Sequence, residues 1–270
     1  MKIQILDRKD NYLRFILSDS YPAFVNALRR IVLSEVPSMT IDDIFFYENT
    51  SAMNDEVMAH RIGLIPLKTD LDTYVLPEEC ECKSEMGCNR CRALATLEVE
   101  AEGSTRVVYS GDLKFEDSDI APTSEKIPIT KIVPGQRLRF EAHAKLGMGK
   151  QHAKWQPVSA CAYKYVPIIE INKKTCDACE ECVKACPKRV LGIKQGKLSV
   201  QRLLDCTLCL ECVKKCPKKP PAIEVEGDVN SFIFNVESTG CLPAERILSE
   251  ATKIFTGKIE KLMKEVKKMG

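Results

Sequence analysis

A four-cysteine phrase occurs twice in this chain of 270 residues, at a constant offset of 30 residues. The first copy ends in Cys186-Pro187 and the second in Cys216-Pro217. Each copy has the C-x2-C-x2-C-x3-C-P spacing of a bacterial two-cluster ferredoxin, in which the fourth cysteine ligates the other cluster. The repeat therefore predicts a duplicated unit that binds two [4Fe-4S] clusters.

The spacing also predicts which cysteines share a cluster. Three thiolates on one tight turn can reach three irons, whereas the fourth must come from outside that turn. The expected ligands of one cluster are Cys176, Cys179, Cys182 and Cys216. Those of the other are Cys206, Cys209, Cys212 and Cys186. Disulfides are disfavoured because the N-terminal sequence has no apolar signal core, and zinc rarely uses cysteine at every third residue.

A second group of cysteines, Cys80, Cys82, Cys88 and Cys91, combines a C-x-C pair with a C-x2-C pair. Four thiolates at this spacing can close a tetrahedral site on a loop too polar to fold alone. Structural zinc is favoured, and free or redox-active thiols are the alternative because C-x-C is tighter than the usual zinc pair. Cys161 and Cys241 have no partner by spacing and are expected to be small buried residues.

Charge is concentrated in the repeat. Residues 172–222 hold 12 Lys and Arg against 5 Asp and Glu, a net charge of +7, whereas the whole chain carries +2. The excess is expected to compensate the clusters, each about −2 with its thiolates. The rest of the chain is at −5 and offers no broad basic face, so direct sequence-specific binding of nucleic acid is not expected. No stretch is long and apolar enough for a membrane span, and a cytoplasmic protein is predicted.

The sequence shows no sign of catalysis. It has no G-x-G-x-x-G motif after a strand, and residues 145–150 fail the phosphate-loop pattern at its first and last positions. The three histidines, His60, His143 and His152, are scattered and are expected to be structural or exposed. No catalytic residues are predicted in this chain.

The two ends of the chain predict an α+β domain. Ile3 and Ile5 alternate before a turn and a second alternating run at 13–17, which is typical of a hairpin. A helix is expected to begin near Pro22, with its apolar stripe on Phe24, Ala27, Leu28, Ile31 and Val32, and to end before Pro37. A strand at 232–236 then precedes a long, narrow apolar seam that runs from Leu248 to Met269 and includes Phe255 and Leu262. Periodicity leaves open whether that seam packs within the chain or on a partner subunit.

Residues 47–171 are predicted to be mostly strands and turns, with short alternating runs at 96–100, 106–109, 136–142 and 165–171. Four further segments then carry a resemblance, at residues 26–42, 55–67, 149–157 and 236–240. In these segments the chain resembles the D subunit of archaeal DNA-directed RNA polymerase, which is similar to the third-largest subunit of eukaryotic RNA polymerase II and to the N-terminal domain of the bacterial alpha subunit. The resemblance spans nearly the whole chain.

The resemblance implies three parts: a dimerisation domain from residues 1–46 and 224–270, an inserted β-rich domain at 47–171, and a ferredoxin-like domain at 172–223. It also implies a heterodimer with subunit L, on which subunits N and P and then the large catalytic subunits assemble. Phe24, Leu28, Arg29, Arg30 and Ile31 would lie in assembly contacts, together with Phe255 and Leu262. The Cys80–Cys91 loop resembles a zinc loop of the eukaryotic relative, with a longer middle spacing.

Two functions follow from these observations. One is a non-catalytic assembly subunit of DNA-dependent RNA polymerase, a nucleotidyltransferase complex that carries out transcription. The other is a ferredoxin-type electron carrier or redox sensor, for which the cysteine repeat alone is sufficient evidence. Copurification with polymerase or with a reductase would distinguish them.

Overall fold

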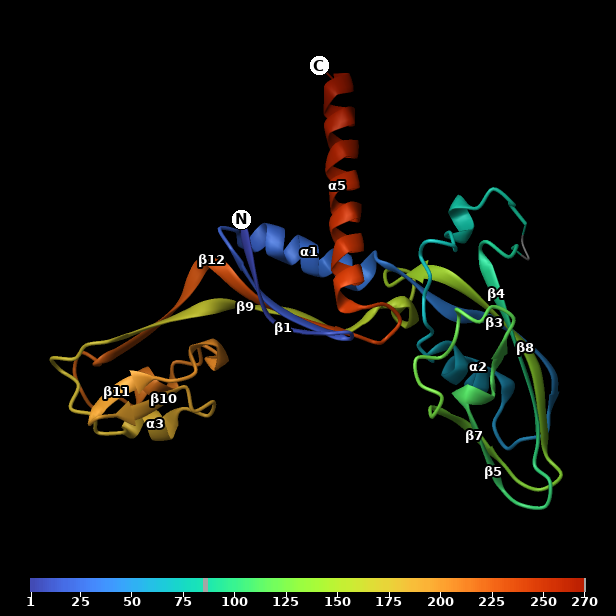
Figure 1. Ribbon diagram of the computed structural model, residues 1–270, viewed down its shortest axis with the longest axis horizontal. Coiled ribbons are helices and arrows are strands. Elements are labelled where there is room, and N and C mark those ends of the chain that lie inside the picture. Colours follow the sequence, from blue (N-terminus) through green and yellow to red (C-terminus); the bar gives the residue numbers. More distant parts are fainter. Residues whose placement is uncertain (85–86, 270) are drawn as a thin grey trace. The chain divides into compact units, whose positions relative to one another are not determined.

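The computed structural model describes residues 1–84 and 87–269 and has a mixed α+β fold (Figure 1). Its contacts divide the chain into two units, which are described separately. The first comprises residues 1–7, 14–26 and 162–235, and the second comprises residues 8–13, 27–161 and the chain from residue 236 on. These limits cut through individual strands, so the three-part division made from the sequence stays a prediction.

The predicted N-terminal hairpin is present. Strands β1 (Lys2–Lys9) and β2 (Tyr12–Ser18) belong to a four-stranded sheet of order β1-β2-β12-β9, completed by β12 (Ile223–Ser238) and β9 (Val158–Ile171). The alternation of β2 buries Leu13, Phe15 and Leu17, and the Phe15 ring stacks on Phe234 with centroids 5.1 Å apart. Strand β1 lies at the edge of the sheet, and its Ile3 and Ile5 are exposed.

Helix α1 (Pro22–Ser34) begins at the proline that the sequence indicated and ends before Pro37. Leu28, Ile31 and Val32 of the predicted stripe are buried, and the structure adds Val25, which is fully buried. Helix α5 (Ala244–Met269) has 26 residues. Its first turns bury Ala244, Ile247 and Ala251, whereas every residue from Thr256 to Met269 is exposed.

The segment between the chain ends contains a second sheet of order β3-β8-β4-β6, made by β3 (Pro37–Asn49), β8 (Arg137–Met148), β4 (Arg92–Glu100) and β6 (Lys114–Phe115). Strands β5 (Arg106–Tyr109) and β7 (Pro128–Ile132) form a separate antiparallel pair. Phe140, Leu97 and Ile41 are among the buried side chains of this core.

The segment consists mostly of strands and turns, as predicted, and helix α2 (Asp55–Gly63) is present in addition. The helix is short and places Met58 and Ile62 in the core, one turn apart. Two apolar residues are too few for a periodicity argument. Its charges do follow the helix dipole, with Asp55 and Glu56 in the first turn and His60 and Arg61 in the last.

The cysteine repeat folds as a repeat. Helices α3 (Glu181–Ala185) and α4 (Glu211–Lys214) occupy equivalent positions, and strands β10 (Leu191–Lys194) and β11 (Lys197–Val200) pair antiparallel beside them. The backbone duplicates as well, since Ala178 and Leu208 have φ of 56° and 57°, and Glu180 and Leu210 have φ of 63° and 62°. Figure 1 shows β9 and β12 leading into this segment and out of it. None of the helices in the described part of the chain is long and apolar enough to cross a membrane.

Candidate metal centres

The duplicated unit encloses two cavities lined by cysteine. One is lined by Cys176, Cys179, Cys182 and Cys216, together with apolar neighbours such as Leu198 and Ile223. The other is lined by Cys186, Cys206, Cys209 and Cys212, together with Leu191 and Val225 among others. Each cavity therefore draws three cysteines from one motif and the fourth from the other, in the combination that the spacing predicts.

The local backbone explains this placement. The left-handed residues at the start of each motif turn the chain tightly enough for three closely spaced cysteines to line one cavity. Each fourth cysteine lies before a proline, beyond the end of a short helix. Backbone N–H groups support two of these distant sulfurs: Val190 donates to Cys186 Sγ at 3.4 Å and Ala222 donates to Cys216 Sγ at 3.3 Å.

The electrostatics of these cavities favour a bound cationic centre. Burial raises the pKa of Cys182 to about 11, and burial also raises the pKa of Cys212. A buried thiolate is costly unless a positive charge lies beside it, and the iron of a cluster supplies that charge. Eight cysteines in two apolar cavities, with N–H donors aimed at sulfur, fit [4Fe-4S] clusters.

The second cysteine group also converges. The sulfurs of Cys80, Cys82, Cys88 and Cys91 all lie within 4.8 Å of one another, and the Cys80–Cys88 and Cys82–Cys91 pairs are 3.7 and 3.8 Å apart. Zinc–sulfur bonds of about 2.3 Å in a tetrahedron place sulfurs about 3.8 Å apart. A disulfide would need about 2.05 Å, so the geometry matches an S4 metal site rather than a disulfide.

The thiols of this site differ in their surroundings. The backbone N–H of Arg90 lowers the pKa of Cys88 to about 7, whereas burial raises the pKa of Cys91 to about 12. The Cys88 N–H also donates to Cys91 Sγ at 3.2 Å. The short helix at Pro77–Glu79 precedes this loop and β4 follows it at Arg92, so both ends of the loop are anchored.

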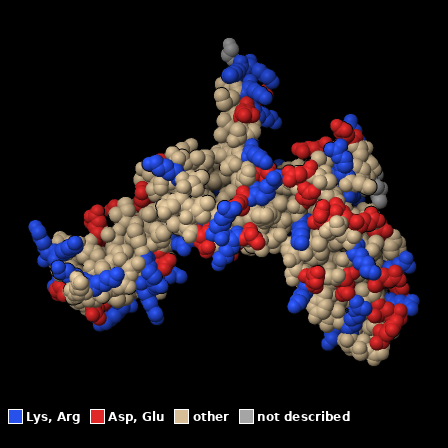
Figure 2. Space-filling view, in the orientation of Figure 1, with Lys and Arg blue, Asp and Glu red and all other residues tan. Residues whose placement is uncertain are grey.

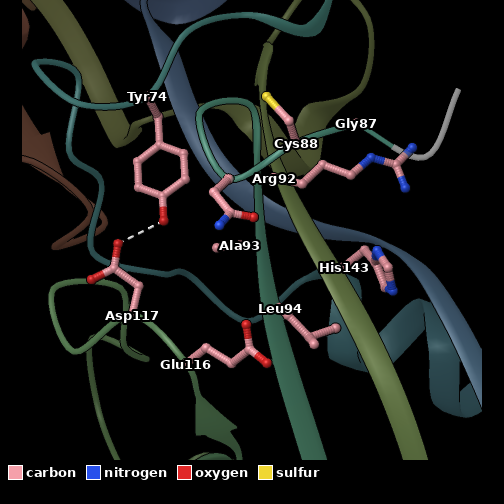
Figure 3. Close-up of a pocket in the computed structure, with 10 residues that line it drawn as sticks. Tyr74, Gly87, Cys88, Arg92, Ala93, Leu94, Glu116, Asp117 and His143 are labelled. Carbon is pink, nitrogen blue, oxygen red and sulfur yellow. Dashed lines mark hydrogen bonds between the residues drawn. The ribbon is translucent and has the colours of Figure 1, made fainter. Parts of the chain in front are cut away.

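A pocket of about 470 Å³ opens beside Cys88 (Figure 3). The Tyr74 hydroxyl donates to Asp117 Oδ2 at 2.6 Å on one side, and Arg92 pairs with Asp43 at 3.1 Å. His143, which lies across the pocket from Tyr74, has its Nε2 2.8 Å from Glu141. The Arg92–Asp43 pair joins β4 to β3, whereas His143 and Glu141 both lie on β8.

The remaining predicted residues divide by exposure. Cys161 and Cys241 are buried as expected, and burial raises the pKa of both thiols. Leu28 and Ile31 are buried within this chain, and Phe24, Arg29 and Phe255 are half-buried. Arg30 is exposed, and Leu262 has 64% of its surface exposed. Of the predicted assembly residues, Arg30 and Leu262 are the most available to a partner.

Sequence reasoning missed one partly buried polar network. Asp42 of β3 forms ion pairs with Lys145 and Lys154. Burial alone would raise the pKa of Asp42, but hydrogen bonds from the two lysines outweigh it and the pKa is lowered. Lys154 also donates to the Ile41 carbonyl at 3.1 Å and lies 4.4 Å from the centre of the Trp155 ring. The sequence contained one sign of this network, because Asp42 directly follows the apolar and β-branched residues 39–41.

Comparisons with known proteins match two segments of the chain, one of which holds the two cysteine cavities. Residues 42–168 match the RNA polymerase Rpb3/RpoA insert domain, and residues 175–220 match a 4Fe-4S dicluster domain. The chain is 42% identical to DNA-directed RNA polymerase subunit Rpo3 of Archaeoglobus fulgidus, over 99% of this chain and 98% of the relative. It is 42% identical to the Rpo3 subunit of Methanothermobacter thermautotrophicus, over 97% and 98%, and 38% identical to that of Methanosphaera stadtmanae, over 97% of each chain. The chain therefore belongs to the Rpo3 family of archaeal RNA polymerase subunits, which is the family of the D subunit.

Proposed function

We propose that this chain is a non-catalytic assembly subunit of RNA polymerase that works in the cytoplasm, forms a heterodimer with subunit L and then recruits subunits N and P and the large catalytic subunits. The observation that carries this proposal is the second half of α5. Its apolar residues Ile259, Leu262, Met263 and Val266 are between 46% and 64% exposed. From Lys258 to Lys268 every remaining position holds lysine or glutamate, so the exposed apolar residues form a stripe rather than a scatter.

An apolar stripe of this length favours a protein partner. Contiguous apolar surface is rare on monomeric proteins and commonly marks an interface.

The dimerisation domain in this proposal consists of residues 1–46 and 224–270, and the inserted domain of residues 47–171 carries the cysteine loop. The ferredoxin-like domain of residues 172–223 holds two [4Fe-4S] clusters on the two exchanged cysteine sets. These clusters supply the bonds that hold together a unit with few helices and strands of its own.

The experiment that tests the assembly role is purification of the native protein without air. We expect it to elute with the large polymerase subunits and with subunit L. The alternative is electron transfer, which the two cysteine cavities favour, and it requires elution with a reductase instead. Elution with a reductase and without polymerase subunits would exclude the assembly role.

The cysteine loop gives a separate prediction. The Cys80–Cys91 site is expected to hold one zinc ion per chain, because its sulfurs already lie at tetrahedral spacing. Changing Cys91 to Ser should remove that zinc, whereas Cys161→Ala, which alters a buried thiol elsewhere, should leave it in place. Elemental analysis of chains purified without air measures both. Equal zinc content in the wild-type and Cys91→Ser chains would show that the metal is bound elsewhere.

A further inference from the structure

A basic pocket of about 610 Å³ lies beside the cavity of Cys186, Cys206, Cys209 and Cys212. Five cationic side chains line it, from four separate segments of the first unit: Arg14, Lys164, Lys188, Arg189 and Arg202. Pro187 and Thr207 complete the lining together with Asp205, the single carboxylate among these residues. Figure 2 shows lysine and arginine side chains gathered over the surface that holds α3, β10 and β11.

The carboxylate does not neutralise the pocket. Asp205 already pairs with Arg202 at 3.7 Å, and Arg202 also donates to the Lys188 carbonyl at 2.6 Å. Arg14 and Lys164 donate to the carbonyl of Leu204, at 3.1 and 2.7 Å, and this acceptor carries no net charge. The buried Nε of Arg14 has no acceptor within the described residues. The five cations outnumber the one carboxylate by four, so the pocket stays net positive even beside a cluster of about −2.

The internal repeat shows that this excess of positive charge occurs in only one half of the duplicated unit. Lys218 and Asp177 form an ion pair at 2.7 Å beside the first cysteine cavity. The equivalent residues in the other half, 30 positions away, are Lys188 and Thr207, which lie beside the second cavity. Threonine thus stands where the repeat would place the acid. Neither Lys188 nor Arg189 has an ion-pair partner in the described part of the chain.

Compensation of cluster charge does not explain the difference. The two cavities have the same cysteine content, so the clusters that they fit have the same charge. The first cavity nevertheless has its lysine neutralised by Asp177, which shows that the fold does not need an unpaired lysine at this position. The unpaired cations Lys188 and Arg189 are available to an external anion.

We propose that this pocket binds a small free polyphosphate, of the class of inorganic pyrophosphate. Phosphate oxygens match the fork of an arginine and the point charge of a lysine, both of which are present here. The volume of about 610 Å³ suits a small ligand. No aromatic side chain is among the described residues that line the pocket, and single-stranded nucleic acid usually needs such a platform for its bases. This inference is independent of the assembly role.

The test is calorimetric titration of the full-length, cluster-loaded chain with inorganic pyrophosphate under argon at low salt. One site is expected, with affinity that falls as salt is added. Thr207→Asp places a carboxylate where the first half has Asp177, and this carboxylate should pair with Lys188. Pyrophosphate binding should then weaken about tenfold, since one charge-assisted contact is lost. Thr207→Asn, which has the shape of aspartate without its charge, should bind pyrophosphate more tightly than Thr207→Asp does.

Two further variants complete the comparison. Arg189→Ala should weaken binding about tenfold, by the same reasoning. Lys218→Ala removes one positive charge from the first half, at the position equivalent to Lys188, and should leave binding unchanged. Cluster absorbance, recorded for every variant, separates loss of the pocket from loss of the clusters. The proposal is overturned if the loaded wild type does not bind pyrophosphate. It is also overturned if Thr207→Asp and Thr207→Asn lose binding equally, or if Arg189→Ala and Lys218→Ala do. An oligonucleotide that binds and is not displaced by pyrophosphate would overturn it as well.

Discussion

Replacing Cys216 with Ser is expected to damage the cluster that Cys176, Cys179 and Cys182 hold, although these three cysteines lie at least 34 residues away in the sequence. The four residues line one cavity, so Cys216 is expected to supply the fourth thiolate there. Iron analysis of a chain purified without air should give about eight irons in the wild type and about four in the variant. The remaining cluster should keep its absorbance.

Double variants separate exchanged ligands from ligands that stay within one motif. Changing Cys182 and Cys216 together should cost no more iron than either change alone, because both belong to one cluster. Changing Cys182 and Cys186 together should remove both clusters, since these neighbours in sequence line different cavities. The opposite pattern would mean that each motif binds its own cluster with all four of its cysteines.

A glutamate at Leu262 is expected to prevent entry of the chain into polymerase. Leu262 is 64% exposed, so the substitution should leave the fold of the chain unchanged. At an apolar interface the new carboxylate would be desolvated without a partner, at a cost of roughly 3 kcal/mol or about 100-fold in association. Phe255→Glu should act in the same direction, although Phe255 is half-buried within the chain and its variant also tests folding.

The matched control is Lys264→Glu on the same helix, two residues further on and so on its opposite side. This variant introduces the same carboxylate into the lysine-rich face and should assemble normally. Copurification with subunit L and the large subunits is the measurement, with cluster absorbance and circular dichroism recorded in parallel. Normal assembly of Leu262→Glu would show that the exposed stripe is not the contact surface.

Short-range patterns allowed much of this fold to be predicted from sequence. The hairpin, the start of α1 and the long C-terminal helix all follow from residues that are neighbours along the chain. The two cysteine cavities were predictable for a similar reason, because a repeat with fixed offset carries its own geometry. In each case the deciding interactions are local or duplicated.

Long-range contacts explain what could not be predicted. Helix α2 exists because Met58 and Ile62 fill the core between strands, and its own short sequence carries little helical signal. The network of Asp42 with Lys145 and Lys154 joins residues more than 100 positions apart. The uncompensated charge of the basic pocket is likewise visible only after Arg14 and Lys164 are placed beside the second cysteine motif.

The ferredoxin-like segment enters and leaves the fold at one point. Strands β9 and β12 are neighbours in the sheet, and where they reach the segment the Asn172 N–H donates to the Ala222 carbonyl at 2.9 Å. The sheet therefore requires of the 49 residues between Asn172 and Ala222 only that their two ends meet, as the ends of a hairpin loop do. A segment joined in this way can be gained, shortened or lost in evolution without a change of strand register, so metal content and polymerase architecture are free to diverge independently within one family.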